Sequence, residues 1–167
     1  MGVLGLDKKR ESGFTLIEML VVIAILVILL AMAIPGFSVW LPNYKLRGAA
    51  QDLYSNMQNA KMEAIKANGE YKMEFFPASG TYKMTSPSGT VQTVTLSDYG
   101  YGITYSDPEG VDAVTYSGDS VTFTSRGMTN KVGGWVKIKN YKDRYYQVGT
   151  LITGVIRLQK WNGSSWQ

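Results

Sequence analysis

The chain begins with an abrupt change from polar to apolar residues. A polar leader, Met1–Gly13, is followed by an almost unbroken apolar run of 21 residues from Phe14 to Ile34. About 20 residues are enough for a helix to span the hydrocarbon core of a bilayer. The only charge in the run is Glu18, whose carboxylate costs at least ~2.5 kcal/mol inside a membrane unless it has a partner. The pattern therefore predicts a membrane helix with a functional acid near its start.

A second helical pattern follows Pro42. Apolar residues recur at steps of three and four, which marks one stripe of a helix: Leu46, Ala49, Ala50, Leu53, Met57, Ala60, Ala64 and Ile65. Asn68-Gly69 supplies a stop signal, so one helix is expected from Phe14 to about Ala67. Pro35-Gly36 and Pro42 are candidate kinks within it.

Beyond Gly69 the period changes to two, which predicts short strands separated by turn residues. The expected strands are Tyr71–Phe76, Gly80–Thr85, Val91–Leu96, Thr104–Tyr105, Ala113–Tyr116, Val121–Thr124, Trp135–Lys139 and Tyr145–Leu158. Short strands without a second helical pattern favour antiparallel pairing. The predicted fold is α+β: a long N-terminal helix, membrane-spanning in its first half, packs by its second half on an antiparallel β domain.

Residues 13–18 read Gly-Phe-Thr-Leu-Ile-Glu and lead directly into the apolar run. They resemble the class III signal of the type IV pilin and type II secretion pseudopilin superfamily, and Pro35 matches a proline of that family. The resemblance implies that a prepilin peptidase cuts between Gly13 and Phe14 and that Phe14 is then N-methylated. It also implies that Glu18 pairs with the N-terminus of an adjacent subunit on assembly.

The resemblance divides the chain into a cleaved cytoplasmic leader (1–13), a transmembrane half-helix (14–35), an amphipathic half-helix (36–68) and a periplasmic or extracellular β domain (69–167). Lys8, Lys9 and Arg10 favour a cytoplasmic N-terminus. The expected location is the bacterial inner membrane, crossed once, and afterwards the pseudopilus or pilus. The expected partners are other pilin or pseudopilin subunits and the prepilin peptidase/methyltransferase.

Later segments resemble the H-type branch of the family, the GspH/FimT-like minor pseudopilins. The helix Leu46–Lys66 carries the branch pattern, and Phe123–Gly127 matches its Phe-x-x-x-Gly segment. The branch usually ends in a Gly-Arg-Val-Arg-like strand. Here Gly154-Val155-Ile156-Arg157 lacks the first arginine. The branch implies a structural subunit of a secretion pseudopilus or a pilus.

Two other interpretations of the N-terminus were considered. Ala31-Met32-Ala33 has the form of an ordinary signal-peptidase site, which would leave a mature chain starting at Ile34. The apolar stretch before it is longer than the roughly 7–15 residues of such signals, and Glu18 interrupts it. A plain membrane anchor would leave Glu18 unexplained.

The composition excludes several classes of chemistry. The chain has no cysteine and no histidine, which removes disulfides, the thiol nucleophile and the commonest metal ligand. No phosphate loop, nucleophile elbow or metalloprotease motif is present. The sequence therefore predicts a protein that is not an enzyme, with no cofactor, metal or small-molecule substrate.

One basic and aromatic segment offers an alternative function. On a strand, Trp135, Lys137 and Lys139 would share one face with Tyr141, and Lys142 and Arg144 follow closely. Such a face can bind nucleic acid by phosphate contacts and stacking, and FimT-like relatives contact DNA. Arg157, Lys160, Trp161 and Trp166 could extend it. The simpler interpretation is a solvated face whose lysines protect a sheet edge, because the net charge is only +4.

An acidic, turn-rich stretch holds Asp107, Glu109, Asp112 and Asp119. Calcium prefers several carboxylate and carbonyl oxygens on a flexible loop. The spacing matches no calcium motif, so these residues are interpreted as turn formers.

Overall fold

The structure is a computed structural model that describes residues 13–167, except for the side chains at positions 33–35 and 39. Most of the leader, residues 1–12, therefore lies outside the described part of the chain. The described residues form two compact units, with the boundary between Ser38 and Val39. The first unit is the apolar half of the helix, and the second holds the remainder of the helix and all the strands.

The single long helix, α1, runs from Leu16 to Lys66. Its backbone remains helical at both Pro35 and Pro42, so neither candidate kink ends it. It ends where Asn68 adopts a positive φ of 47° and the Gly69 N–H donates to the Ala64 carbonyl (3.0 Å). This is a Schellman-type cap in which asparagine takes the left-handed position that glycine usually occupies.

The predicted stripe of α1 faces the core. Its buried members are Leu46, Ala49, Ala50, Leu53, Met57, Ala60 and Ala64. The four alanines on this face leave room for the sheets to approach the helix closely. Ile65 was predicted to belong to the stripe, and this was wrong: it is 47% exposed. It lies at the rim, where it contacts the loop at Gly127.

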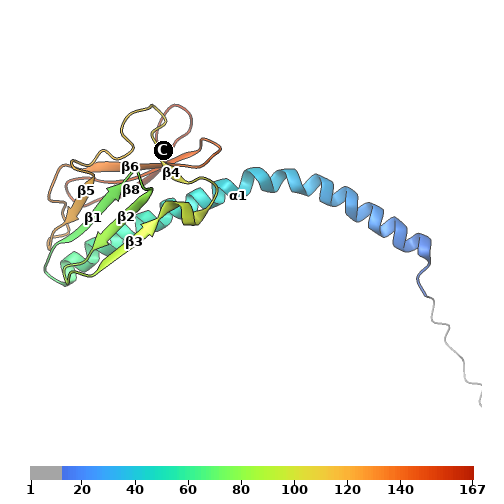
Figure 1. The fold of residues 1–167 in the computed structure, drawn as a ribbon, viewed down its shortest axis with the longest axis horizontal. Helices are drawn as coiled ribbons and strands as arrows, with labels where there is room; N and C mark the ends of the chain where they lie inside the picture. Colours follow the sequence, from blue (N-terminus) through green and yellow to red (C-terminus); the bar gives the residue numbers. More distant parts are fainter. Residues whose placement is uncertain (1–12) are drawn as a thin grey trace, which may run out of the picture. The chain divides into compact units, whose positions relative to one another are not determined.

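Two four-stranded antiparallel sheets pack with this half of α1. The first has the order β3-β2-β1-β5, formed by Val91–Thr95, Thr81–Thr85, Tyr71–Phe76 and Ser120–Phe123. The second has the order β4-β6-β7-β8, formed by Thr104–Tyr105, Gly134–Lys139, Tyr145–Thr150 and Ile156–Lys160. Strands β1 to β3 lie along the C-terminal half of α1 (Figure 1). The predicted α+β class is confirmed.

Hydrogen bonds connect the helix to both sheets. The Asn56 side-chain amide donates to the hydroxyl of Tyr82 on β2 (2.9 Å), and the Lys61 ammonium donates to the Gly154 carbonyl beside β8 (2.9 Å). Burial raises the pKa of Tyr82 to about 12, so this buried hydroxyl remains uncharged. The stripe and these bonds fix how the sheets lie on the helix.

Three strand predictions were wrong. Ala113–Tyr116 is not a strand but makes one isolated bridge, from Val114 to Val136. Leu96 begins a short 3₁₀ helix, η1 (Leu96–Tyr99), instead of ending β3. Tyr145–Leu158 is not one strand but two, β7 and β8.

The break between β7 and β8 has a physical cause at Gly154. Its φ of +75° favours glycine, and its N–H closes a turn on the Leu151 carbonyl (2.9 Å). A Cβ at Gly154 would lie 1.8 Å from the Gly127 carbonyl oxygen. The two glycines of the branch motifs are therefore in contact, and neither period nor composition signals that contact.

We expect Leu53→Asp to lower the free energy of unfolding by about 3–5 kcal/mol, because it places an unpaired charge at a fully buried helix position. Leu53 is only 1% exposed. A soluble fragment beginning at Asn43 should be folded and monomeric, and its chemical denaturation measures the effect. Asn59→Asp, at an exposed position of the same helix, is the matched control. Equal stability of the two variants would contradict the packing of α1 on the sheets.

Candidate processing and assembly site

The start of α1 is organised by two side chains that bond each other's backbone. The Glu18 N–H donates to Thr15 Oγ1 (3.3 Å), and the Thr15 N–H donates to Glu18 Oε2 (3.5 Å). This reciprocal pair is a capping box, in which a Thr and a Glu three residues later satisfy donors that the first turn leaves free. The negative charge also lies favourably at the positive end of the helix dipole.

The capping box changes the interpretation of Glu18. In the sequence this carboxylate was expected to have no partner until assembly, but it has a local one within its own chain. The signal was available, because Thr15-Leu16-Ile17-Glu18 has the spacing of a capping box. The box also explains why α1 begins at Leu16 and not at Phe14, since Thr15 takes the capping position.

Gly13 and Phe14 lie just outside the helix. Phe14 is 80% exposed, and a Cβ added at Gly13 would meet nothing within 4 Å. Gly13 also has no positive φ. The folded subunit therefore does not require glycine at position 13, so a requirement for it would have to come from another molecule.

The first unit exposes an exceptional amount of apolar surface. The large side chains from Leu16 to Leu30 are all exposed, and among the described residues α1 is the one helix long and apolar enough to cross a membrane. Continuous apolar surface of this kind is characteristic of a membrane-embedded or subunit-contacting face. The acid at its start is thus the only charged side chain in this stretch of the helix.

The first part of the basic and aromatic segment lies on β6, where its predicted alternation is confirmed, whereas Tyr141, Lys142 and Arg144 lie in the connection between β6 and β7. Val136 and Ile138 are buried in the core, whereas Trp135, Lys137 and Lys139 lie on the opposite face. Lys137, however, is not a free cation. Its ammonium makes a close ion pair with Asp107, and the two side chains are 12% and 1% exposed.

This pair overturns one expectation about the segment. Lys137 was expected on a solvated face, and that is wrong, because its side chain is only 12% exposed. Lys139 is also paired, with Asp143 (3.0 Å). Tyr141 stacks on Tyr101 with ring centroids 6.4 Å apart. The cations on this segment that remain exposed and outside the ion pairs of the described residues are Lys142 and Arg144.

Asp107 is held in its ionised form by its neighbours. Burial opposes ionisation, but the hydrogen bonds from Lys137 and from the Glu109 N–H (2.6 Å) outweigh it and lower the pKa of this carboxyl below its ordinary value. Asp107 is therefore engaged by a lysine and a turn. Within residues 13–167 the structure brings no three Asp or Glu side chains together as a metal site.

Comparison with known families gives two matches in one chain. Residues 8–34 match the prokaryotic N-terminal methylation motif. Residues 49–154, more than half of the chain, match the type II transport protein GspH family. The chain belongs to the GspH family. Membership places it in the type IV pilin and pseudopilin superfamily and makes it a structural subunit of a pilus or pseudopilus.

Two solved structures are similar to this GspH-family chain. The type IV minor pilin FimU of Pseudomonas aeruginosa is 16% identical, with a TM-score of 0.51 over 75% of this chain and 94% of that one. The minor pseudopilin EpsH of the Vibrio cholerae type 2 secretion system is 14% identical, with a TM-score of 0.49 over 68% and 95%. No curated protein sequence matches the chain. The likeness to FimU supports the pilin-like α+β fold.

We expect Asp107→Asn to lower the free energy of unfolding by about 3 kcal/mol at neutral pH, because it leaves Lys137 charged and largely buried without a partner. The pKa of Asp107 in the folded protein lies below its ordinary value of 3.8. The ionised carboxylate therefore contributes its full stabilisation above pH 3.8, and this stabilisation is lost as the pH falls through the folded-state pKa. The difference from wild type should therefore narrow as the pH falls below 3.8. Chemical denaturation of both proteins across this range measures it.

The control is Asp143→Asn, which breaks the more exposed pair with Lys139 and should cost less than about 1 kcal/mol. If both variants lost the same stability at neutral pH, the buried pair would have no special role.

Proposed function

We propose that this GspH-family chain is made as a prepilin, cut between Gly13 and Phe14 and methylated on the new N-terminus, and then assembled as a minor subunit. The observation that carries the proposal is the order of the two matches, a methylation motif over residues 8–34 followed by a GspH domain over residues 49–154. The assembly is a type II secretion pseudopilus or a type IV pilus.

The proposed topology places residues 1–13 in the cytoplasm, residues 14–35 in the inner membrane, and residues 36–68 and 69–167 in the periplasm. Three basic residues in the leader favour this orientation. The exposed apolar side chains from Leu16 to Leu30 would be covered by lipid before assembly and by neighbouring helices afterwards.

Glu18 is proposed to guide docking by pairing with the Phe14 ammonium of the adjacent subunit. Two opposite charges attract strongly where the dielectric constant is low, and pairing avoids burying either charge alone. Cleavage creates that ammonium, so the unprocessed chain could not offer it. This would make processing a precondition for assembly.

We do not propose DNA capture as the function. Lys137, at the centre of the predicted DNA-binding face, is paired with Asp107, and Lys139 is paired with Asp143. Binding through phosphates needs cations that are free to replace counterions. Salt-sensitive binding of labelled duplex DNA to the protein would restore this alternative.

We expect intact-mass analysis or N-terminal sequencing of membrane-extracted protein to find a mature chain that begins with methylated Phe14. Gly13→Ala should be processed more slowly, and Gly13→Leu hardly at all, because a protease cleft at that position accepts little side chain. The fold tolerates both changes, since nothing lies within 4 Å of a Cβ at Gly13. A mature chain beginning at Ile34 would end the prepilin proposal.

Two variants distinguish the role of the Glu18 charge from its role in the capping box. Glu18→Gln removes the charge but can keep the capping box, because Gln serves at this position as well. Thr15→Ala removes the Thr15 hydroxyl of the capping box and keeps the charge. If the proposed pairing operates, Glu18→Gln should insert into the membrane but fail to enter filaments, whereas Thr15→Ala should enter them. The readout is the amount of the subunit in sheared filaments from cells that lack the wild-type copy, and the opposite ranking would assign Glu18 a capping role only.

A further inference from the structure

Strand β8 forms one edge of its sheet and pairs only with β7. Hydrogen bonds flank the β7–β8 pairing at both ends: the Leu151 N–H donates to the Val155 carbonyl (2.9 Å), and the Trp161 N–H donates to the Tyr145 carbonyl (3.1 Å). In the register of the two strands, Arg157 and Gln159 occupy the equivalent positions, and their backbone groups face β7. In an antiparallel pair, successive residues direct their backbone groups to opposite edges. The N–H and C=O groups of Ile156, Leu158 and Lys160 therefore point away from β7.

The end of the chain already occupies one of these outward positions. Gln167 and Lys160 exchange two backbone hydrogen bonds, from the Lys160 N–H (2.7 Å) and from the Gln167 N–H (2.9 Å). Gln167 thus lies beside β8 as a residue of a paired antiparallel strand would. Among the described residues, no turn, loop or side-chain hydrogen bond involves the backbone of Ile156 or Leu158.

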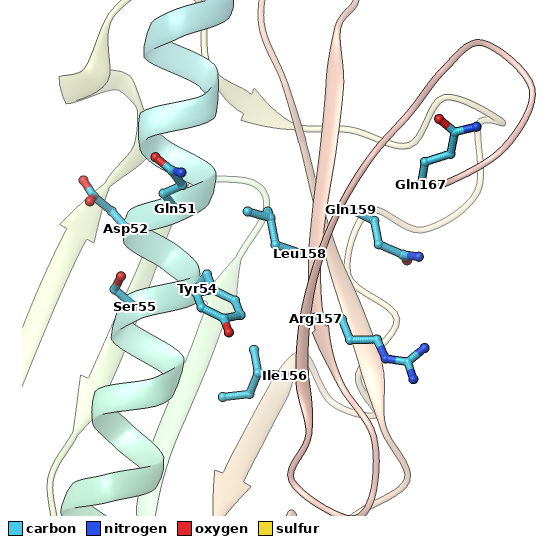
Figure 2. A pocket seen from close by; sticks show the side chains of 9 residues that line it. All are labelled: Gln51, Asp52, Tyr54, Ser55, Ile156, Arg157, Leu158, Gln159 and Gln167. Carbon is cyan, nitrogen blue, oxygen red and sulfur yellow. The ribbon is translucent and has the colours of Figure 1, made fainter.

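A groove of about 790 Å³ continues from that point. One wall is the helix at Gln51, Asp52, Tyr54 and Ser55, and the other is residues 156–159 of β8, with Gln167 at one end. The side chains of Tyr54, Ile156 and Leu158 point into the space between helix and strand (Figure 2). Arg157 and Gln159 point to the other face of the sheet.

The charges near the open edge favour an acidic partner. Arg157 is exposed on the outer face of β8, and none of the ion pairs among the described residues includes it or Lys160. In a strand added beside Leu158 and Ile156, the side chains alternate between the groove and the outer face. A residue facing outwards would then lie next to the Arg157 guanidinium, which binds carboxylates well.

We propose that the edge of β8 receives an extended segment of a neighbouring pilin-family subunit. The segment runs antiparallel to β8, lies beside Ile156 and Leu158, and places an acidic side chain beside Arg157. Main-chain hydrogen bonds to Ile156 and Leu158 supply the attachment, and the groove side chains select the segment, as in other β-augmentation sites. This inference rests on the proposed function, because it assumes incorporation into a filament.

The other open edge that offers several residues, β3 (Val91–Thr95), lacks the features that single out β8. No segment of the described chain bonds the outer side of β3 as Gln167 bonds Lys160. The hollow beside β3 is lined by residues of β3 and η1 alone, so α1 forms no wall of it. β3 therefore serves as the control edge.

The first test is photocross-linking of the full-length chain in cells that assemble its filament. Ser55→p-benzoylphenylalanine places the photoreactive group on the groove wall at an exposed position. We expect one adduct, with another subunit that carries an N-terminal methylation motif. The control is the same change at Gln92 on β3, which should give none. An adduct with a protein that lacks such a motif, or no adduct, overturns the proposal.

The second test removes one backbone donor without breaking the pairing to β7. Leu158→Pro deletes the outward N–H, and Leu158→Ala makes the same loss of side-chain packing while keeping that N–H. We expect filament incorporation of the proline variant to fall about tenfold below that of the alanine variant. Arg157→Glu should also reduce incorporation, whereas Arg126→Glu, the same charge change at another exposed site, should not. Melting temperatures of the four variants identify any that fail to fold.

The outcomes separate this inference from the proposed function. If the wild-type chain is absent from filaments, the proposed function fails. If the wild-type chain is present but the proline and alanine variants incorporate equally, and Arg157→Glu behaves like Arg126→Glu, only the β8 docking site is overturned.

Discussion

The structure depends on the burial of one stripe of α1 against two sheets. Leu53 and Met57 fill the interface, and the alanines around them let the strands approach closely. Each large apolar side chain that is fully buried contributes roughly 1.5–3 kcal/mol to the stability of the fold. Without this face the two sheets would lack a common partner, because each is an open four-stranded sheet with edges of its own.

The same helix meets two different requirements along its length. From Leu46 to Ala64 it has one apolar face and a solvated one, whereas from Leu16 to Leu30 it exposes apolar side chains all round. An apolar surface of this size is typical of a helix that lipid or other subunits cover. A membrane-embedded or subunit-contacting face of this kind agrees with membership of the GspH family.

The β domain shows how tertiary contacts change the meaning of individual charges. Lys137 and Asp107 are 30 residues apart, and each belongs to a segment that suggested a different ligand, DNA for one and calcium for the other. Their pairing satisfies both charges inside the protein. In contrast, Arg157 on β8 is exposed and belongs to none of the ion pairs among the described residues.

The sequence by itself determined the features that depend on local order along the chain. These are the apolar span with Glu18, the helical stripe, the stop at Asn68, and the alternation of Val136 and Ile138 with lysines, because helix and strand periods are read from neighbouring residues. Even the capping box of Thr15 and Glu18 could be read from their spacing. Only the tertiary structure decided the order of the strands, the split of β7 from β8 at Gly154, the pairing of Lys137 with Asp107, and the open edge beside Leu158. The strand order, the contact of Gly154 with Gly127 and the ion pair join residues distant in sequence, and neither period nor composition specifies which distant segments meet.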